Sequence, residues 1–571
     1  MESQPPAPVA GKLIITAPSG VERELEITHG QFTLGRGANS DIILQDDWVS
    51  RAHARLDVSA GAYTLTDLGS ANGIIVNGVP VTETALKPGD VVMIGTTTVR
   101  LIPTISDPVP EVVALDTEAQ VNATIVASAV PVSVNDTSLP RLAIRSISRT
   151  WELALDGDAL SIGRQGDNDI FLDDPKVSRH HARVERRGSA FIIRDLDSAN
   201  GFYAGAERIT ERVLKPGETI RIGGAEIIYK PGFTSSDLTI VEESRAAKEG
   251  RRPIVFVPGM MGSELWRGSE MVWPNPRLLF SDPEIFQLPN RYPLEPRGVV
   301  RQVVIVPNLI KQEQYSSVGD FFEQDLGYER GKNYLDFPYD WRQDVRESAR
   351  LLAAAIDNWG VRQPITLIAH SLGTLVSRYY VERLGGKDKV GRLILMGGPH
   401  LGTPKSATSL VLGPNLLPFG LFGERLRHVL MTLPSTYQIL PTYPCVVDQR
   451  GAALNLLEDE SWAADDQRSL IRMAREFRSE LGTRSSVSTL SIFGYGHKTV
   501  TRLNIHRHVD GMWNNVQLEV QPDGDATIPQ HSAILSQTEI HPVHQNHGAL
   551  FLDNDVKMRL KLELTGQILP A

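Results

Sequence analysis

The run Pro364-Ile-Thr-Leu-Ile-Ala-His-Ser-Leu-Gly-Thr-Leu-Val376 sets a serine between an apolar stretch and an amphipathic one. Residues 365–368 are mostly β-branched and predict a buried strand, and the pattern of 375–384 predicts a helix. The small alanine and glycine that flank the His-Ser-Leu segment leave room for a sharp turn. Strand, tight turn and helix are the parts of a nucleophile elbow, so we predict that Ser371 is a nucleophile. A plain strand-to-helix turn is the alternative.

A second apolar run, at 253–257, leads into the glycine-rich loop Pro-Gly-Met-Met-Gly-Ser at 258–263. In serine hydrolases, one backbone N–H of such a loop and the N–H of the residue after the nucleophile bind the oxyanion. On this pattern Met260 and Leu372 form the oxyanion hole through their backbones, so their side chains are not decisive.

Two runs near the end of the sequence supply the remaining candidates, Asp-Gly-Asp-Ala-Thr-Ile-Pro at 523–529 and His-Pro-Val-His-Gln-Asn-His-Gly at 541–548. The order Ser371, Asp525, His547 is the order serine, acid, histidine of α/β-hydrolases. We therefore predict Asp525 as the acid and His547 as the general base.

Asp523 and His544 are the alternatives for these two roles. Asp525 is preferred because its spacing to the proline at 529 suits an acid at the end of a late strand. His547 is preferred because a helical segment, 549–562, is expected directly after it. The other histidines of the run would then have no catalytic role.

Four runs resemble motifs of the lecithin:cholesterol acyltransferase family: Val-Pro-Gly-Met-Met-Gly-Ser-Glu-Leu at 257–265, Phe-Pro-Tyr-Asp-Trp-Arg at 337–342, Gly-Pro-His-Leu-Gly-Thr-Pro-Lys at 398–405 and Pro-Ser-Thr-Tyr-Gln-Ile-Leu-Pro at 434–441. They follow the order of the family. The resemblance implies an α/β-hydrolase domain over 251–571 that acts on an acyl ester, of lipid type. Some members pass the acyl group to an alcohol, so hydrolysis and acyl transfer both stay open.

The chain departs from the extracellular members of that family in its cysteines. It contains one, Cys445, so no intrachain disulfide can form, and a catalytic role for this lone thiol is not expected. The first eight residues are polar and proline-rich, unlike a signal peptide, and no apolar run is long enough to span a bilayer. These features predict a cytoplasmic protein.

The N-terminal part is an internal repeat with an offset of 128 residues (163 − 35). Four motifs return in the same order, so one module has been duplicated. The first copy has Gly-Arg at 35–36, Ser-Arg-Ala-His at 50–53, Ser-Ala-Asn-Gly at 70–73 and Leu-Lys-Pro-Gly-Asp at 86–90. The second has Gly-Arg at 163–164, Ser-Arg-His-His at 178–181, Ser-Ala-Asn-Gly at 198–201 and Leu-Lys-Pro-Gly-Glu at 214–218. Short β-rich runs between turn residues predict a β-sandwich for each copy.

These motifs resemble the forkhead-associated (FHA) domain, which binds phosphothreonine peptides. Arginine offers a two-pronged fork to phosphate, serine adds a hydroxyl, and asparagine can hold the peptide backbone. The histidines at 53 and 181 are expected to brace the loops. The resemblance implies two binding sites, formed by Arg36, Ser50, Arg51 and Asn72 in domain 11–103 and by Arg164, Ser178, Arg179 and Asn200 in domain 141–232. Modules that no longer bind are the alternative.

The linkers at 104–140 and 233–250 share a short phrase, Thr-Ile-Val, which begins at Thr124 and at Thr239. A threonine before aliphatic residues in such a segment is a plausible kinase substrate, although coincidence in a valine-rich linker explains the phrase as well. The expected FHA ligand is therefore a phosphothreonine protein or the phosphorylated linker of the chain itself.

Residues 405–426 form an apolar stretch whose glycines and prolines argue against a regular helix. A lid over the acyl pocket, with transient contact to a membrane surface, and ordinary core packing both explain it.

Length and composition agree with a multidomain chain of two all-β modules and one α/β domain. The 571 residues exceed one domain, 41% of them are hydrophobic, and the net charge of −10 gives no basic stripe for nucleic acid. We predict no metal and no cofactor. The competing class is a phosphopeptide-binding adaptor with an inactive hydrolase domain.

Overall fold

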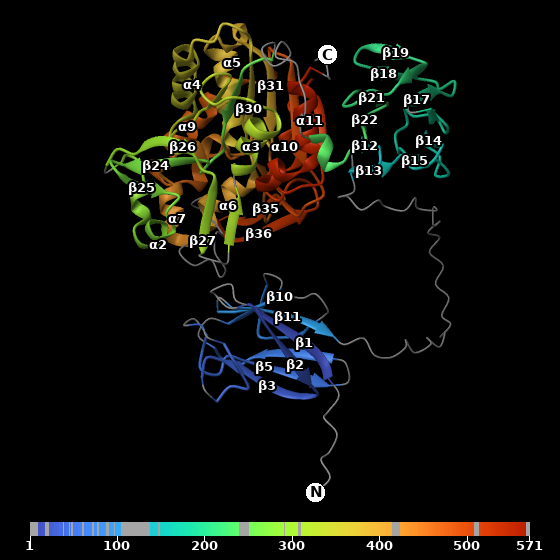
Figure 1. Ribbon diagram of the computed structural model, residues 1–571. Coiled ribbons are helices and arrows are strands. Elements are labelled where there is room, and N and C mark those ends of the chain that lie inside the picture. The colour runs from blue at the N-terminus through green and yellow to red at the C-terminus, as the bar shows by residue number, and fades with distance from the viewer. Residues whose placement is uncertain are drawn as a thin grey trace, which may run out of the picture. The chain divides into compact units, whose positions relative to one another are not determined.

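The computed structural model describes residues 9–566, except for the segments 17–21, 38, 45, 47–48, 60–61, 71–72, 77–78, 87–90, 96, 104–136, 147–148, 189, 239–250, 291, 307–309, 314, 414–422 and 508–512. It contains two β-sandwiches and an α/β domain (Figure 1). The chain divides into two compact units: the first sandwich belongs to one, and the second sandwich and most of the α/β domain to the other.

The first sandwich consists of a six-stranded and a five-stranded sheet. The six-stranded sheet has the order β2 (Glu22–Thr28), β1 (Val9–Thr16), β11 (Thr97–Pro103), β10 (Val91–Ile94), β7 (Ile74–Val76), β8 (Val79–Val81). The five-stranded sheet has the order β4 (Ile42–Ile43), β3 (Gly30–Gly35), β5 (Ala54–Ser59), β6 (Ala62–Asp67), β9 (Glu83–Leu86).

The second sandwich repeats this arrangement strand for strand. Its six-stranded sheet has the order β13 (Thr150–Ala154), β12 (Arg141–Arg145), β22 (Ala225–Lys230), β21 (Thr219–Ile222), β18 (Phe202–Ala204), β19 (Glu207–Ile209). Its five-stranded sheet has the order β15 (Ile170–Phe171), β14 (Ala159–Gly163), β16 (Ala182–Arg187), β17 (Ala190–Asp195), β20 (Glu211–Val213).

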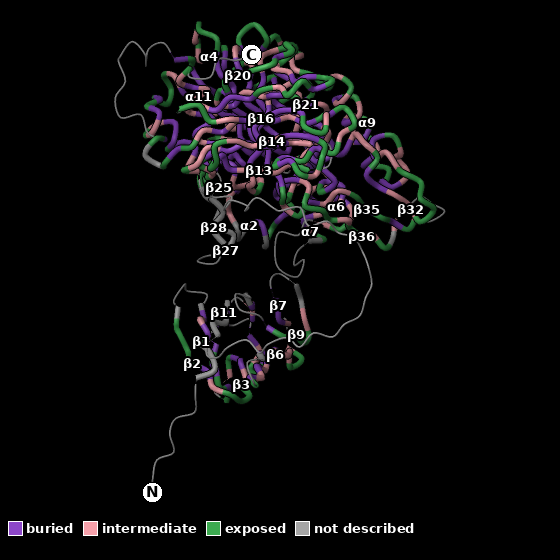
Figure 2. The backbone as a smooth tube through the Cα atoms, turned by 90° about the vertical axis from the view of Figure 1, so that its right-hand side faces the viewer, coloured by how far each residue is buried: buried purple, intermediate pink, exposed green. Residues whose placement is uncertain are grey.

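Alternation along the strands places one face of each sheet on the core. On β16, Ala182 and Val184 are buried while Arg183 between them is exposed. Figure 2 shows buried segments inside the larger unit and exposed segments along its outline. The predicted β-sandwich of each copy is therefore confirmed.

The α/β domain is built on a six-stranded sheet whose five strand pairings are all parallel. Its order is β29 (Tyr334–Asp336), β23 (Ile254–Val257), β30 (Ile365–His370), β31 (Val390–Met396), β34 (Thr489–Gly494), β37 (Glu539–Val543). Every residue of β23, β30 and β34 is buried, as expected for strands covered on both faces.

Helices cover the sheet on both faces. On one face, the segments α3 (Ser316–Asp320), η3 (Phe321–Asp325), η7 (His547–Leu552) and α11 (Asn554–Leu564) share an apolar core with the strands. Helix α5 (Leu372–Arg383) contacts β23, β30 and β31, and α4 (Val345–Trp359) packs beside α5.

The remaining elements surround this core. They are η1 (Ser235–Leu238), β24 (Ser263–Arg267), β25 (Glu270–Trp273), α2 (Pro276–Ser281), η2 (Pro283–Phe286), β26 (Glu295–Val299), β27 (Gln302–Val306), β28 (Ile310–Glu313), η4 (Gly386–Asp388), α6 (Pro404–Leu412), α7 (Gly423–Leu430), α8 (Pro434–Gln438), β32 (Val446–Asp448), β33 (Ala453–Leu454), η6 (Glu460–Trp462), α9 (Asp465–Leu481), β35 (Thr499–Arg507), β36 (Trp513–Gln521) and α10 (Gln530–Ala533).

Two sequence expectations need correction. The stretch 405–426 was expected to avoid regular helix, yet α6 occupies 404–412 and α7 begins at 423. Leu410 on α6 packs in a buried apolar cluster, so this part is core; residues 414–422 lie outside the described residues. Residues 233–250 were predicted as a linker, yet Phe233 and Leu238 pack on Met558 of α11.

Candidate functional site

Ser371 stands at the turn between β30 and α5 with a positive φ of 51°. Its N–H donates to the carbonyl of Met396 on the neighbouring strand at 2.9 Å. A side chain at Gly373 would place Cβ 2.3 Å from the carbonyl oxygen of Pro258, so only glycine fits there. The turn is therefore held in the strained conformation of a nucleophile elbow, with the Ser371 residue partly exposed.

Asp525, His547 and Ser371 form one hydrogen-bonded chain. Nε2 of His547 lies 2.9 Å from Oγ of Ser371, and Nδ1 of His547 lies 2.7 Å from Oδ2 of Asp525. With Nδ1–H donated to the carboxylate, Nε2 is free to accept the proton of the serine hydroxyl. The arrangement can activate the hydroxyl as a nucleophile.

The loop around Asp525 orients the carboxylate. Its Oδ1 accepts the backbone N–H groups of Thr527 at 3.0 Å and Ile528 at 2.6 Å, so only Oδ2 faces the imidazole. The carbonyl of Asp525 accepts the N–H of His547 at 2.9 Å, which ties the two loops together. The side chain of Asp525 is 1% exposed.

His544 and Asp523, the alternative base and acid, make other contacts. His544 packs against His497 in a tilted arrangement, with ring centroids 4.7 Å apart, and its ring also lies next to Gly496. Asp523 accepts the N–H of Gln530 through its backbone carbonyl at 3.2 Å. The geometry thus distinguishes Asp525 and His547 from their neighbours.

The glycine-rich loop after β23 lies directly against Ser371. A Cβ at Gly259 would sit 2.8 Å from Cβ of Ser371. The next residue is Met260, and the N-terminus of α5 with Leu372 contacts the same loop through Gly373. The two predicted oxyanion donors therefore belong to adjoining backbone segments.

Sequence reasoning missed a second chain of hydrogen bonds behind the serine. Gly259 donates its N–H to the hydroxyl of Tyr315 at 2.9 Å, and this hydroxyl lies 2.8 Å from Nδ1 of His370. Nε2 of His370 lies 3.1 Å from the carbonyl of His547. Because a carbonyl oxygen can only accept, Nε2 of His370 carries the proton, and Nδ1 accepts the hydroxyl proton of Tyr315. Burial, together with the nearby His547, holds the pKa of His370 well below its usual value, so the ring stays neutral.

This second chain joins the glycine-rich loop after β23, the turn at Ser371 and the loop of His547. The histidine in the Ala-His-Ser segment was visible in the sequence, but its partner Tyr315 is 55 residues away and lies in no motif.

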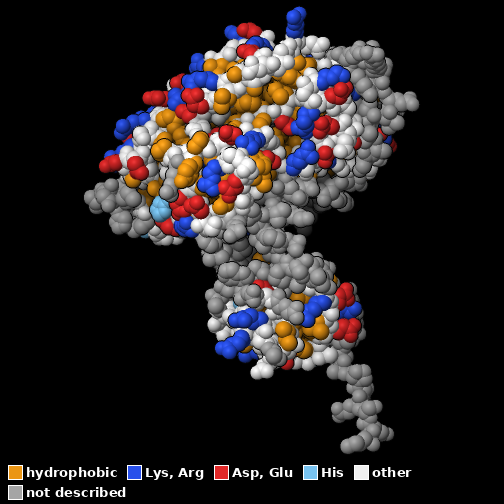
Figure 3. Space-filling model, turned by 60° about the vertical axis from the view of Figure 1, so that its left-hand side comes forward, with side chains coloured by type: hydrophobic (Ala, Val, Ile, Leu, Met, Phe, Trp, Pro, Cys, Tyr) orange, Lys and Arg blue, Asp and Glu red, His pale blue; other side chains and the backbone are white. Residues whose placement is uncertain are grey.

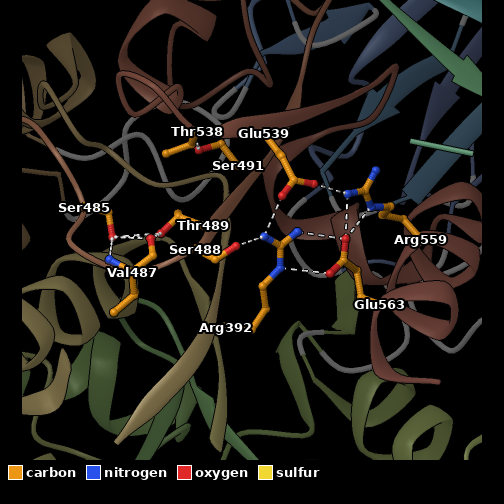
Figure 4. A network of polar contacts seen from close by, with 10 residues as sticks. All are labelled: Arg392, Ser485, Val487, Ser488, Thr489, Ser491, Thr538, Glu539, Arg559 and Glu563. Atoms are coloured by element: carbon orange, nitrogen blue, oxygen red, sulfur yellow. Dashed lines mark hydrogen bonds and ion pairs between the residues drawn. The ribbon is translucent and has the colours of Figure 1, made fainter. Parts of the chain in front are cut away.

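Strand β37, which leads into the histidine loop, is anchored at its first residue. Nη1 of Arg392 donates to Glu539 at 2.7 Å, and Nη2 of Arg559 donates to it at 2.9 Å. Both arginines also donate to Glu563 of α11 (Figure 4). These four side chains connect β31, β37 and α11.

In the second sandwich, the four predicted phosphopeptide residues share a cavity of about 480 Å³, lined by Arg164, Lys176, Ser178, Arg179, His180 and Asn200, among others. Oγ of Ser178 accepts the N–H of Ala199 at 3.1 Å, and Nδ2 of Asn200 donates to the carbonyl of Lys176 at 2.7 Å. The guanidinium groups are left at an exposed edge. Lys176 is not among the predicted residues, because it does not recur in the repeat. The corresponding residue of the first copy is Trp48.

The first sandwich has the same loop hydrogen bonds. Arg36 donates its N–H to the carbonyl of Ser50 at 3.0 Å, as Arg164 does to that of Ser178 at 2.9 Å. Arg51 is exposed, and Asn72 lies outside the described residues.

The prediction that His53 and His181 brace the loops is confirmed. In each, Nδ1 accepts the N–H of the motif serine at 3.0 Å, and Nε2 contacts the carbonyl of Gly73 or Gly201. Both side chains are fully buried.

Other candidates contribute less. Burial raises the pKa of Cys445 to about 12, which keeps its thiol protonated. Thr124 and Thr239 lie outside the described residues.

Along the described part of the chain, no helix has the length and apolar character to cross a membrane. On the face drawn in Figure 3, basic and acidic side chains are interspersed.

Comparison with known families separates the three parts. Residues 160–223, which lie within the second sandwich, match the FHA domain. Residues 17–104 match the family described as "Inner membrane component of T3SS, cytoplasmic domain". Residues 306–491 match the lecithin:cholesterol acyltransferase family, a range that contains Ser371 but ends before Asp525.

Relatives among characterised proteins cover a small part of the chain. The glycogen accumulation regulator GarA of Mycolicibacterium smegmatis is 40% identical over 83 residues, 14% of this chain and 52% of that protein. The transcriptional regulatory protein EmbR of Mycobacterium tuberculosis is 44% identical over 77 residues, 13% of this chain and 20% of that protein. The chain thus spans about half of the first relative and a fifth of the second.

A solved structure, Mycobacterium tuberculosis EmbR in complex with a low-affinity phosphopeptide, is 35% identical, covers 17% of this chain and 25% of that one, and has a TM-score of 0.16.

Proposed function

We propose that the chain is a serine hydrolase of carboxylic esters with an α/β-hydrolase domain, directed by phosphothreonine-binding FHA domains. The observation that carries the catalytic part is the hydrogen-bonded chain from Asp525 through His547 to the hydroxyl of Ser371 on its strained turn. A strained serine joined to a base and an orienting acid is the arrangement that nucleophilic acyl transfer requires.

The reaction would run in two halves. Oγ of Ser371 attacks the ester carbonyl while Nε2 of His547 takes the hydroxyl proton, and the N–H groups of Met260 and Leu372 stabilise the oxyanion. Collapse expels the alcohol, which receives the proton from His547 and leaves an acyl-serine. Water then attacks with His547 as base, the carboxylic acid departs, and Oγ regains its proton.

The substrate class rests on the match of 306–491 to the lecithin:cholesterol acyltransferase family, which favours a lipid ester. A lipid alcohol in place of water in the second half would make the same site an acyltransferase. Product analysis of the acyl-enzyme with water alone and with an added long-chain alcohol separates the two outcomes.

The FHA part is supported by the match of 160–223 and by the charged cavity at that position. Arg164, Arg179 and Lys176 bring three cations to one exposed edge, which suits a dianionic phosphate. We extend the assignment to the first sandwich because its strand order and loop hydrogen bonds are the same. The proposed location is the cytoplasm, where phosphothreonine ligands are made.

A panel of phospholipids and soluble short-chain esters tests the proposal, with wild type compared with Ser371→Ala. Cleavage of at least one ester class that is lost in Ser371→Ala is expected. Absence of cleavage across the panel, together with retained phosphopeptide binding, would favour the adaptor in its place.

A further inference from the structure

One face of the second sandwich is packed against the α/β domain. Ala143 on β12 and Ile228 on β22 are fully buried and share an apolar cluster with Phe493, Ile528 and Ile540 of the α/β domain. Ala143 and Ile228 are partners across their two strands, so they form a continuous patch.

Charged groups border this patch. Nζ of Lys230, 1% exposed, donates to Oδ2 of Asp555 at 2.5 Å, to the carbonyl of Pro542 at 2.5 Å and to Oε1 of Glu152 at 2.7 Å. Arg141 lies 3.2 Å from Oδ1 of Asp555. Burial alone would raise the pKa of Asp555, but Lys230 and the other positive neighbours outweigh it and lower the pKa to about 2. Breaking one side of such a buried pair is strongly unfavourable.

The contacted segments are those that carry the acid and the base. Ile528, whose side chain is in the patch, donates its backbone N–H to Oδ1 of Asp525 at 2.6 Å. Thr150 donates to Oε1 of Gln530, two residues further on, at 2.8 Å. Lys230 holds a carbonyl of β37, the strand that leads into the loop of His547.

The first sandwich carries a different kind of residue at the position of Ile228. In β11, which corresponds to β22, Arg100 occupies the position of Ile228. On the neighbouring strands Lys12 lies 3.6 Å from Glu24, and their side chains are 45% and 65% exposed. At this one position the sequence is basic in the first copy and apolar in the second, while both copies carry charged residues on the neighbouring strands.

We propose that the second FHA domain is a structural part of the catalytic unit. Ile228 and Lys230 are positioning residues that hold the acid loop and strand β37 so that Asp525 and His547 stay aligned with Ser371. The inference rests on the proposed function, because alignment of these side chains matters only if they act as acid and base.

Separation of the second sandwich from the α/β domain would expose Phe493, Ile528 and Ile540. It would also leave Asp555 without Lys230, its main counter-charge. The two segments 523–530 and 539–547 would then fluctuate more. A displacement of about 1 Å in a reacting group can lower turnover on the order of 10²-fold.

Ile228→Arg tests the proposal because it installs the residue that the first copy carries at this position. The matched control is Phe171→Arg, an apolar side chain of the same sandwich that is 39% exposed on β15. Lys230→Met is the second variant, which removes the charge and keeps much of the side-chain length. Hydrogen exchange and the steady-state kinetics of a soluble short-chain ester are measured in the full chain.

In Ile228→Arg and Lys230→Met we expect faster exchange at 523–530 and 539–547 and a kcat lowered at least about tenfold, with KM little changed. Protection of β16 and β17 should stay as in wild type, which shows that the sandwich is folded. Phe171→Arg should match wild type in both measurements.

If these segments exchange at the wild-type rate in Ile228→Arg and Lys230→Met, the proposal is overturned. Faster exchange with an unchanged kcat would overturn it as well. Exchange does not depend on turnover. A failure of the proposed function is seen separately, as ester cleavage that survives Ser371→Ala.

Discussion

At the scale of single residues, the site depends on which oxygen and nitrogen atoms face one another. The carboxylate of Asp525 is held by two backbone N–H groups and points one oxygen at His547. Asp525→Asn removes the acceptor that fixes the imidazole tautomer, and the loss should lower kcat by about 10⁴ with the fold intact.

Asp523→Asn is the matched control for this change, since the two carboxylates lie in the same loop. Kinetics on one soluble ester compare the two variants. A silent Asp525→Asn beside a crippled Asp523→Asn would mean that the acid is misassigned.

Tyr315 supports a second residue-scale prediction. Tyr315→Phe leaves Nδ1 of buried His370 and the N–H of Gly259 without their partner, which should cost about 1–3 kcal/mol of stability. Because these groups flank the turn, kcat should also fall while KM stays.

Tyr328→Phe is the control for Tyr315→Phe, because it removes a hydroxyl from the same apolar cluster. Its bond to the carbonyl of Arg252 is long, at 3.4 Å, so little change is expected. Thermal unfolding and steady-state kinetics are compared for the two variants. Equal effects of the two changes would show that Tyr315 contributes only packing.

At the scale of elements, the loops of the second sandwich present a cationic edge. Arg179→Ala should weaken binding of a phosphothreonine peptide by about 10- to 100-fold, the loss of one hydrogen bond to a charged group of about 1.5–3 kcal/mol. Arg183→Ala, an exposed arginine of β16, should bind as wild type does. Calorimetric titration with the phosphorylated and unphosphorylated peptide checks both, and unphosphorylated binding of equal strength would contradict the assignment.

The sequence predicted those elements whose signals are local. Ser371 lies in a strand–turn–helix pattern, and the motif residues of the repeat recur at a constant offset. The prediction was wrong for 405–412 because the glycines and prolines that argued against a helix all follow α6. Tyr315 and the role of Ile228 could not be predicted, because their partners lie far away in the chain and share no motif with them.

At the scale of the whole molecule, buried histidines link stability to pH. Burial holds the pKa values of His370, His400 and His541 well below their usual value. The unfolded chain takes up protons below about pH 6.5 that the folded chain does not, so stability falls as pH decreases through this range. Each such histidine contributes a slope of up to about 1.4 kcal/mol per pH unit.

His400→Leu removes one of these titrations and should reduce the pH dependence of thermal unfolding between pH 7 and pH 5 by about one proton. The control is His428→Gln on α7, whose side chain is 55% exposed, and the change in slope should be larger in His400→Leu than in this variant. An unaltered slope in His400→Leu would show that this ring is not kept neutral by burial.

Covalent labelling tests the central claim most directly. The wild-type chain is treated with a fluorophosphonate, and the adduct is located by mass spectrometry alongside Ser371→Ala and His547→Gln. We predict a single adduct on Ser371, none in Ser371→Ala, and a labelling rate in His547→Gln lower by orders of magnitude, because the hydroxyl loses its base. Labelling of a different residue, or of Ser371 at the same rate without His547, would contradict the account.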